Sequence, residues 1–330
     1  MKQYHYFFGV DISKKTIDIS LIHLETNSHQ KFMNDAEGMK ELLGWLKKLQ
    51  LHFDQSIFCM EATGLYCFTL TQFLATNSID VWIEHAAQIK RATALARGKN
   101  DKVDSQRIAI YCQKNLDRLR LWRPMDATIQ KIKQLASLRD RLVETQKKLL
   151  VPINELEESG NMEMAKLLRK TMKKSAAALD ADLKATERKI IEIVNSDENL
   201  KNLYRVITSV VGIGFVTAVN LIIHTNGFTI LNDTRKLACY CGVAPFEFSS
   251  GTSVRGKTQV HFMANKKLKC NLHMASLTAT KLDPDIKIYY ERKVAEGKNK
   301  MSVLNAVRNK LLARIVSCVN NQREYVKNVA

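Results

Sequence analysis

The stretch GVDISKKTIDI, residues 9–19, places two arms of alternating apolar and polar residues around a short turn that contains two lysines. Alternation with a period of two is typical of strands, and a polar break between two such arms predicts an antiparallel β-hairpin. The pattern extends outward to residues 4–12 and 16–24, and HQKFMN, residues 29–34, predicts a third strand. The chain is therefore expected to open with a small antiparallel sheet.

Helical and strand patterns alternate after this hairpin. SIFCM, residues 56–60, is an apolar run that predicts a short buried strand ending at Glu61, and IDVWIEH, residues 79–85, predicts another strand. A helix with its apolar face along residues 39–49 precedes them, and ATGLYCFTLTQFL, residues 62–74, predicts a helix between them. Strands that alternate with helices in this way predict a mixed α/β sheet covered by helices.

Long helical patterns replace the strands from about residue 126. Apolar residues recur at steps of three, four or seven along residues 129–156 and again along residues 168–193. This spacing predicts two long helices that form an antiparallel hairpin or coiled coil, with the turn at Gly160. Shorter helical patterns follow to the end. We therefore expect three domains, at residues 1–125, 126–197 and 198–330.

The composition is strongly basic. Lys and Arg number 51 against 33 Asp and Glu, a formal net charge of +18, which favours a polyanionic partner, nucleic acid before an anionic membrane surface. The seven scattered cysteines contain no Cys-x-x-Cys pair, so they indicate neither a disulfide framework nor a zinc site and fit a reducing cytoplasm. Residues 206–223 form an uncharged run, but its glycines and Asn220 and its lack of an aromatic belt argue against a membrane span.

Four carboxylates stand at the ends of predicted elements. Asp11 ends the first strand, Glu61 follows the SIFCM strand, and Asp101 and Asp104 open the helix predicted by KNDKVDSQRIA, residues 99–109. If the two strands are neighbours, these side chains converge at one sheet edge, where they would suit magnesium, a hard cation that takes oxygen ligands. A plainer interpretation makes Asp101 and Asp104 an N-cap and a first-turn acid, and Asp11 a turn residue.

Two glycine-containing turns in the last domain are candidates for phosphate binding. In ITSVVGIGFVTAVNLI, residues 207–222, Gly212 and Gly214 predict a helix-hairpin-helix turn whose backbone N–H groups hold phosphate; the alternative is an interhelical turn that needs glycine for close packing. In APFEFSSGTSVRGK, residues 244–257, a serine beside a glycine can expose its hydroxyl on a tight turn. Arg255 and Lys257 could neutralise a phosphate there, although ordinary loop hydroxyls would give the same sequence.

Taken together, GVDISKKTIDI, EATGLY (residues 61–66) and KNDKVDSQRIA resemble the three N-terminal motifs of insertion-sequence transposase family one hundred and ten. The order of the acids is similar to that of the RuvC-like branch of the ribonuclease H fold. On this resemblance the fold is a RuvC-like α/β domain, a helical coiled-coil hairpin and a mostly helical C-terminal transposase domain, and the family's magnesium ligands fall on Asp11, Glu61, Asp101 and Asp104. Ser105 stands where the family commonly has alanine.

The resemblance extends to the C-terminal domain. The segment APFEFSSGTSVRG, residues 244–256, is similar to the family signature in which the serine immediately before glycine is the nucleophile. That position is Ser250, with Ser249 as its rival. NKKLKCNLHMAS, residues 265–276, resembles the family's basic helix, although Ala264 stands where glycine is usual. This likeness implies nucleic-acid contacts at Lys266, Lys267 and Lys269.

The resemblance implies a bacterial, cytoplasmic recombinase that cuts and rejoins donor and target DNA. Ser250 would form a phosphoserine link, with magnesium at the four acids assisting, in a homodimer or tetramer guided by a structured bridge RNA. Two other functions stay open. A metal-dependent nuclease would use water on branched DNA and survive loss of Ser250. A non-catalytic nucleic-acid-binding protein would need neither the serine nor the metal. The sequence leaves open the target sites, the guide structure and the identity of the metal.

Overall fold

The computed structural model describes residues 2–23, 26–92, 100–250 and 254–326. For Ser250, Arg255 and Lys257 it describes the backbone and not the side chain. The chain divides into two compact units, residues 1–124 and 125–330, which are taken separately below. The expected boundary between residues 197 and 198 stays a prediction.

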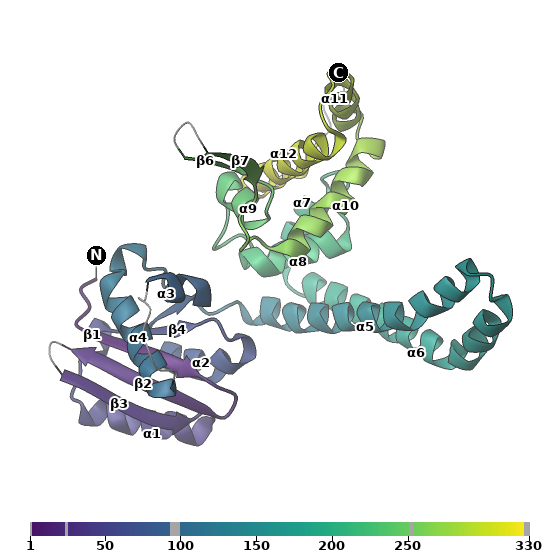
Figure 1. Cartoon of the computed structure of the whole chain (residues 1–330). Coiled ribbons are helices and arrows are strands. Elements are labelled where there is room, and N and C mark those ends of the chain that lie inside the picture. Colours follow the sequence, from purple (N-terminus) through teal and green to yellow (C-terminus); the bar gives the residue numbers. More distant parts are fainter. Residues whose placement is uncertain (1, 24–25, 93–99, 251–253, 327–330) are drawn as a thin grey trace. The chain divides into compact units, whose positions relative to one another are not determined.

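The first unit is built on a five-stranded mixed sheet (Figure 1). Its order is β3-β2-β1-β4-β5, in which β1, β2 and β3 pair antiparallel and β1, β4 and β5 pair parallel. The predicted hairpin and third strand are confirmed, and so is the mixed α/β sheet. The strand bounds are β1 Tyr6–Ile12, β2 Thr16–His23, β3 Thr26–Met33, β4 Ser56–Glu61 and β5 Asp80–Glu84.

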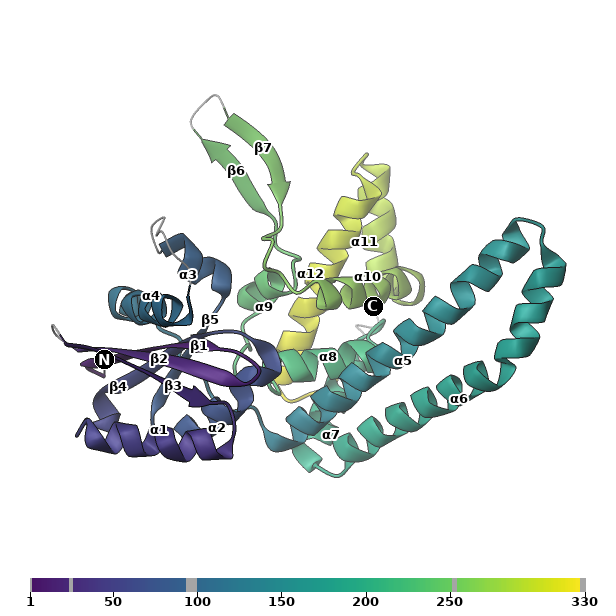
Figure 2. The ribbon, with the colours of Figure 1, turned by 60° about the horizontal axis from the view of Figure 1, so that its bottom comes forward.

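Helices cover both faces of this sheet, as Figure 2 shows with the sheet close to edge-on. One face packs on α1 (Ala36–Lys48) and α2 (Phe68–Thr76), and the other on α3 (Ala86–Ala92) and α4 (Asp101–Lys114). The helix expected from residue 62 begins later, because a 3-10 turn, η2 (Gly64–Cys67), precedes α2 and Gly64 has a positive φ of 68°. Two further 3-10 turns are η1 (Phe53–Gln55) and η3 (Leu116–Arg118).

The second unit begins with the predicted helical hairpin. Helices α5 (Ala127–Glu158) and α6 (Met162–Asn195) run side by side, and Gly160 makes the turn with a φ of 85°. Full burial is confined to the two ends of the hairpin, because no described residue from 137 to 152 or from 166 to 185 is fully buried. The antiparallel helices are confirmed, whereas a continuous coiled-coil seam stays a prediction.

The base of this hairpin, where α5 begins and α6 ends, shares one hydrophobic core with the C-terminal helices. Apolar residues of α5 and α6, including Ile132 and Ile190, are buried with residues of α8 (Phe215–Thr225) and α12 (Lys300–Asn320). The remaining elements are α7 Glu198–Thr208, α8 Phe215–Thr225, α9 Thr234–Tyr240, β6 Phe246–Ser250, β7 Val254–Gln259, α10 Lys266–Leu282, α11 Pro284–Ala295 and α12 Lys300–Asn320.

The uncharged run at residues 206–223 is divided between the end of α7 and most of α8 by the turn that contains Gly212 and Gly214. A Cβ on Gly212 would lie 2.5 Å from the carbonyl oxygen of Ala275 in α10, and the φ of Gly212 is 94°. Gly212 thus satisfies both a left-handed turn and close helix packing. Across the described parts of the chain, we find no helix with the length and hydropathy of a membrane span.

Candidate active-site residues

Strand register brings Asp11 and Glu61 together. In the parallel pair of β1 and β4, Val10 lies opposite Met60, and Asp11 and Glu61 are the next residue of each strand. Val10 and Met60 are fully buried on the face covered by α1 and α2. Because side chains alternate along a strand, Asp11 and Glu61 belong to the opposite face, the one that α4 covers.

Helix α4 lies very close to this face because of Gly9. A Cβ on Gly9 would lie 2.1 Å from both the backbone nitrogen of Ala109 and the carbonyl oxygen of Ser105. The Ser105 hydroxyl is fully buried and hydrogen-bonds that of Ser20 in β2 at 2.7 Å. Ser105 therefore joins the helix to the sheet beside Gly9, and Asp11 follows two residues later on the same face of β1.

The first turn of α4 carries the other two acids. The Asn100 side chain accepts a hydrogen bond from the backbone N–H of Val103 at 2.8 Å and caps the helix. The interpretation of Asp101 as the N-cap is therefore wrong. Asp101 and Asp104 both lie in the first turn, where the helix dipole favours negative charge.

Electrostatics shows that these acids influence one another. The pKa of Asp11 is raised from 3.8 to about 6, first by burial and then by the charges of Asp101, Asp104 and Glu61, with Asp18 contributing last. Like charges oppose ionisation of a carboxyl group when they are close to it. Glu61, Asp101 and Asp104 therefore lie near enough to Asp11 to raise its pKa.

Cations already engage part of this acidic cluster, which we define as Asp11, Asp18, Glu61, Asp101 and Asp104. Lys31 Nζ lies 3.0 Å from Asp18 Oδ2 and 3.3 Å from Asp101 Oδ2, and Arg107 Nη1 lies 2.9 Å from Asp104 Oδ1. Among the described residues, no three His, Cys, Asp or Glu side chains are grouped tightly enough to hold one metal ion. The donor set still fits a hard divalent cation, because its oxygens are carboxylates and the pKa of Asp11 is raised by burial and by the neighbouring acids.

Sequence reasoning missed three residues of this region. Asp18 pairs with Asp11 in the β1–β2 register and is 4 % exposed, and Glu84 pairs with Glu61 in the β4–β5 register. An acid inside the apolar strand 16–23 could have indicated Asp18, and an acid that ends a strand, as Glu61 does, could have indicated Glu84. No local pattern indicates the role of Lys31, because its partners Asp18 and Asp101 lie on other elements, β2 and α4.

The serine candidates lie on a two-stranded ribbon, β6–β7, which extends from the helices of the second unit (Figure 2). Ser250 ends β6 and pairs through its backbone with Val254, and Ser249 pairs with Arg255. The Ser249 side chain is exposed. The predicted turn residue Gly251 lies outside the described residues, as do residues 252 and 253.

The base of this ribbon is held by a polar network. Gly242, with a φ of 64°, ends the helix predicted to stop there, and the backbone N–H of Asn265 donates to the carbonyl of Tyr240 at 2.7 Å. The Tyr240 hydroxyl lies 3.0 Å from His224 Nδ1, and Asn265 Nδ2 lies 3.3 Å from the same nitrogen. These contacts fix both ends of the ribbon against α8 and α10.

The predicted basic residues of α10 have different surroundings. Lys266 is exposed, and Lys267 forms an ion pair with Asp140 of α5. Lys269 is partly buried, with its Cδ 3.4 Å from the position of a Cβ on Gly242. The first turn of α10 contains no acidic residue. Its N-terminus thus combines a positive helix end with lysines.

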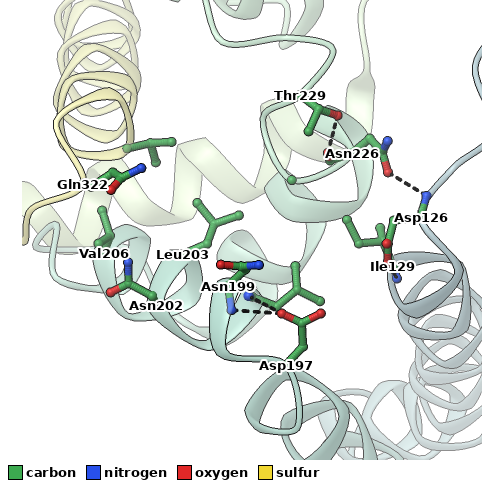
Figure 3. A pocket seen from close by; sticks show the side chains of 13 residues that line it. Asp126, Ile129, Asp197, Asn199, Asn202, Leu203, Val206, Asn226, Thr229 and Gln322 are labelled. Carbon is green, nitrogen blue, oxygen red and sulfur yellow. Dashed lines mark hydrogen bonds between the residues drawn. The ribbon is translucent and has the colours of Figure 1, made fainter.

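A cavity of ≈ 400 Å³ lies elsewhere in the second unit, among the ends of α5, α7 and α8 (Figure 3). Two of its acids are already used as helix caps, since Asp126 accepts from the N–H of Thr128 and Asp197 from that of Asn199. None of the predicted site residues lines it. The cavity is therefore not a candidate for the catalytic chemistry.

Known proteins match both units. Residues 8–156 match the family model of the IS110 DEDD transposase domain, described as "Transposase", and residues 204–291 match "Transposase IS116/IS110/IS902 family". The pilin gene-inverting proteins of Moraxella bovis and Moraxella lacunata are each 24% identical to the chain over 326 residues, 98% of this chain and 98% of theirs. The insertion element IS110 uncharacterized 43.6 kDa protein of Streptomyces coelicolor is 33% identical over 99 residues, 30% of this chain and 24% of that protein.

The two family matches cover the elements described above. The first includes β1, β4 and α4, which carry the four predicted acids, and the second includes the β6–β7 ribbon and the start of α10. The chain therefore belongs to the IS116/IS110/IS902 family of transposases.

Proposed function

We propose that the protein cuts and rejoins DNA through a covalent link to Ser250, assisted by a divalent cation at Asp11, Glu61, Asp101 and Asp104. The observation that carries this proposal is the pairing of β1 with β4 under the closely packed α4, together with the raised pKa of Asp11, which comes first from burial and then from the charges of Asp101, Asp104 and Glu61. Such a concentration of carboxylates is unfavourable without a cation and favourable with one. The sheet order and parallel pairing of β1 and β4 support the RuvC-like, ribonuclease H interpretation of this unit.

The proposed covalent step is a transesterification. Ser250 Oγ forms a bond to a DNA phosphorus, the bond from that phosphorus to a sugar oxygen breaks, and the serine proton is released while the departing oxygen gains a proton. Attack by a sugar hydroxyl of another strand reverses the step, rejoins the DNA and frees Ser250. When bound, the cation, for which we propose Mg²⁺, supplies positive charge to the phosphodiester.

Rejoining distinguishes this proposal from a nuclease. The Moraxella relatives are named for inverting a pilin gene, and inversion requires that cut strands be joined again. The likeness to them over 98% of the chain favours a recombinase over an enzyme that only cuts.

Other parts of the proposal concern nucleic-acid contacts. The backbone N–H groups of the turn at Gly212 and Gly214 begin α8 without a side-chain cap, which leaves them available to a phosphate as in a helix-hairpin-helix. We further propose that Arg255, Lys257, Lys266 and Lys269 contact phosphates, that a bridge RNA guides the target choice, and that the α5–α6 hairpin serves assembly of a homodimer or tetramer. The three expected domains would divide these tasks.

The test is a search for protein-linked DNA. The full chain is incubated with the element's own RNA, labelled donor and target DNA and Mg²⁺, and the products are separated on a denaturing gel. We expect an adduct with the unmodified chain and with Ser249→Ala, and none with Ser250→Ala or Asp11→Ala. Ser249 is a matched control because it is the adjacent hydroxyl on the same strand.

Two outcomes would contradict the proposal. Cleavage that continues in Ser250→Ala with no adduct in any variant indicates a metal-dependent nuclease that uses water. Binding without cleavage, unchanged by Mg²⁺ in every variant, indicates a non-catalytic nucleic-acid-binding protein whose affinity depends on salt alone.

A further inference from the structure

Arg308 of α12 is a buried cation without an acidic partner. Its side chain belongs to a residue that is 5 % exposed, and among the described residues no carboxylate forms an ion pair with it. Its Nη2 lies 2.7 Å from His273 Nδ1, its Nη1 donates to Asn305 Oδ1 at 3.3 Å, and its Nε is buried with no hydrogen-bond partner. Both neighbours are uncharged acceptors in these contacts.

A second arginine on the same helix has the opposite surroundings. Arg314 Nη1 lies 2.7 Å from Asp283 Oδ2, and its guanidinium stacks over the ring of Tyr325 at 4.7 Å. Arg314 is thus neutralised within the protein, and Arg308 is not. Proteins rarely bury an arginine unless it is paired, because removing a charge from water is unfavourable when nothing compensates it.

Burial has visible consequences at Arg308. It lowers the pKa of Arg308, and burial together with the Arg308 charge lowers the pKa of His273. His273 is therefore held neutral, so that Nδ1 accepts a hydrogen bond from the guanidinium. One positive charge and one unused donor, Nε, remain uncompensated.

This arginine is linked to the base of the β6–β7 ribbon. Asn305, which accepts from Arg308, donates through Nδ2 to the carbonyl of Val243 at 2.8 Å. Val243 follows Gly242, against which the stem of Lys269 packs. Lys269 and His273 are neighbours one turn apart on α10, both partly exposed, and the described residues give Lys269 no acidic partner either.

We propose that Arg308, Lys269 and His273 form a seat for a backbone phosphate of a nucleic acid at the base of the ribbon. A phosphate bound beside Lys269 and His273 would bring negative charge close to the guanidinium of Arg308, which has no acidic partner among the described residues. The charge of the surrounding sequence favours this ligand over an acidic peptide surface, because residues 198–330 carry 20 Lys and Arg against 8 Asp and Glu. This inference rests on the proposed function for the phosphate contact of Lys269 and for the identity of the ligand as DNA or RNA, and it adds Arg308 and His273.

The experiment compares the full chain with Arg308→Met and, as a matched control, Arg314→Met. Thermal unfolding is followed in chloride and in sulfate at equal ionic strength, and binding of a DNA duplex and of an RNA hairpin is titrated at several salt concentrations. Sulfate stabilises proteins in general, so the readout is the difference between variants in the sulfate-induced shift of the melting temperature.

We expect Arg308→Met to melt in chloride at the temperature of the unmodified chain or above it, because an uncompensated buried charge is removed. It should lose part of the sulfate-induced shift, bind its nucleic acid about tenfold more weakly, as for one charge-assisted contact, and show a salt slope reduced by about one. Arg314→Met should melt lower in both salts and keep the sulfate shift and the slope. Whichever nucleic acid loses affinity identifies the source of the phosphate.

A structural role for Arg308 gives a different pattern. Arg308→Met would then melt lower by the same amount in chloride and sulfate, with an unchanged salt slope, and the proposal would be wrong. If Arg308→Met does not fold, Arg308→Lys and Lys269→Gln provide the same comparison with smaller changes. An unchanged salt slope of nucleic-acid binding in both variants would show that the proposed phosphate site is wrong. Failure of the serine chemistry is separate, because Ser250→Ala leaves this binding test unaffected.

Discussion

Asp11 is the residue at which the candidate metal site can be tested through stability. Its folded pKa of about 6 exceeds its ordinary value of 3.8, so the folded state binds the proton more tightly than the unfolded state does. Stability that depends on this proton is present below about pH 4 and is lost as the pH rises through about 6. Above that pH, the ionised Asp11 destabilises the metal-free fold.

We therefore predict that Asp11→Asn stabilises the metal-free protein above pH 7 by about 1 kcal/mol, a figure reduced from the pKa difference because the group is only half-buried. The gain should vanish near pH 4, and Mg²⁺ should stabilise the unmodified chain and not the variant. Urea unfolding with a chelator and with Mg²⁺, across this pH range, checks it. A variant that is less stable at every pH would show that the carboxylate is needed structurally.

The Lys31 ammonium lies beside two acids of the acidic cluster, Asp18 and Asp101. Its pKa is raised first by its hydrogen bond to Asp18 and then by that to Asp101. We predict that Lys31→Met binds Mn²⁺ or Mg²⁺ roughly two- to fivefold more tightly. The Lys31 ammonium competes with the metal ion for the carboxylates, and its contribution is about that of an exposed ion pair. Calorimetric titration measures this, with Lys40→Met as control, since the ion pair of Lys40 among the described residues is with Glu37 on α1. Weaker binding by Lys31→Met would mean that Lys31 positions Asp101 for the metal.

At the scale of elements, the contact between α4 and β1 determines how close Asp101 and Asp104 lie to Asp11. We predict that Gly9→Ala destabilises the first unit by about 3 kcal/mol and abolishes catalysis, because its Cβ would overlap the α4 backbone and displace Asp101 and Asp104. Gly44→Ala in α1 is the control: its Cβ meets nothing within 4 Å, and alanine should stabilise that helix by up to about 1 kcal/mol. Denaturant unfolding of both variants gives the comparison. Equal stability of the two would show that α4 can move away without loss.

These elements also show what the sequence could predict. Period-two alternation around Asp11 and apolar runs that end at Glu61 depend on local pattern, so the strands and their acids were predictable. The close approach of Gly9 to α4, the ion pairs of Lys31 and the acid-free burial of Arg308 depend on contacts between segments distant in sequence. Local pattern contains no information on such contacts. The apolar pattern predicts a start of α2 at residue 62, which is too early, because it does not reveal the left-handed conformation of Gly64.

At the scale of the whole molecule, positive charge is distributed unevenly. Residues 1–125 contain 17 Lys and Arg against 13 Asp and Glu, residues 126–197 contain 14 against 12, and residues 198–330 contain 20 against 8. Net charge attracts nucleic acid largely through release of counterions from phosphates. The near-neutral α5–α6 hairpin, with exposed Leu138, Val151 and Leu167, is therefore better suited to protein contacts than to holding RNA.

The charge distribution predicts how binding divides between the two compact units. Each has its own buried core, so we expect residues 1–124 and 125–330 to fold as separate fragments, which circular dichroism and cooperative melting check first. Fragment 125–330 should then keep most of the affinity of the full chain for duplex DNA and nearly all of its salt slope. Fragment 1–124, with a net charge of only +4, should bind DNA weakly and bind Mg²⁺ through the acidic cluster. Equal salt slopes for the two folded fragments would contradict this division, because nucleic-acid binding would then depend on local arrangement of charge in the first unit rather than on the excess of Lys and Arg in the second.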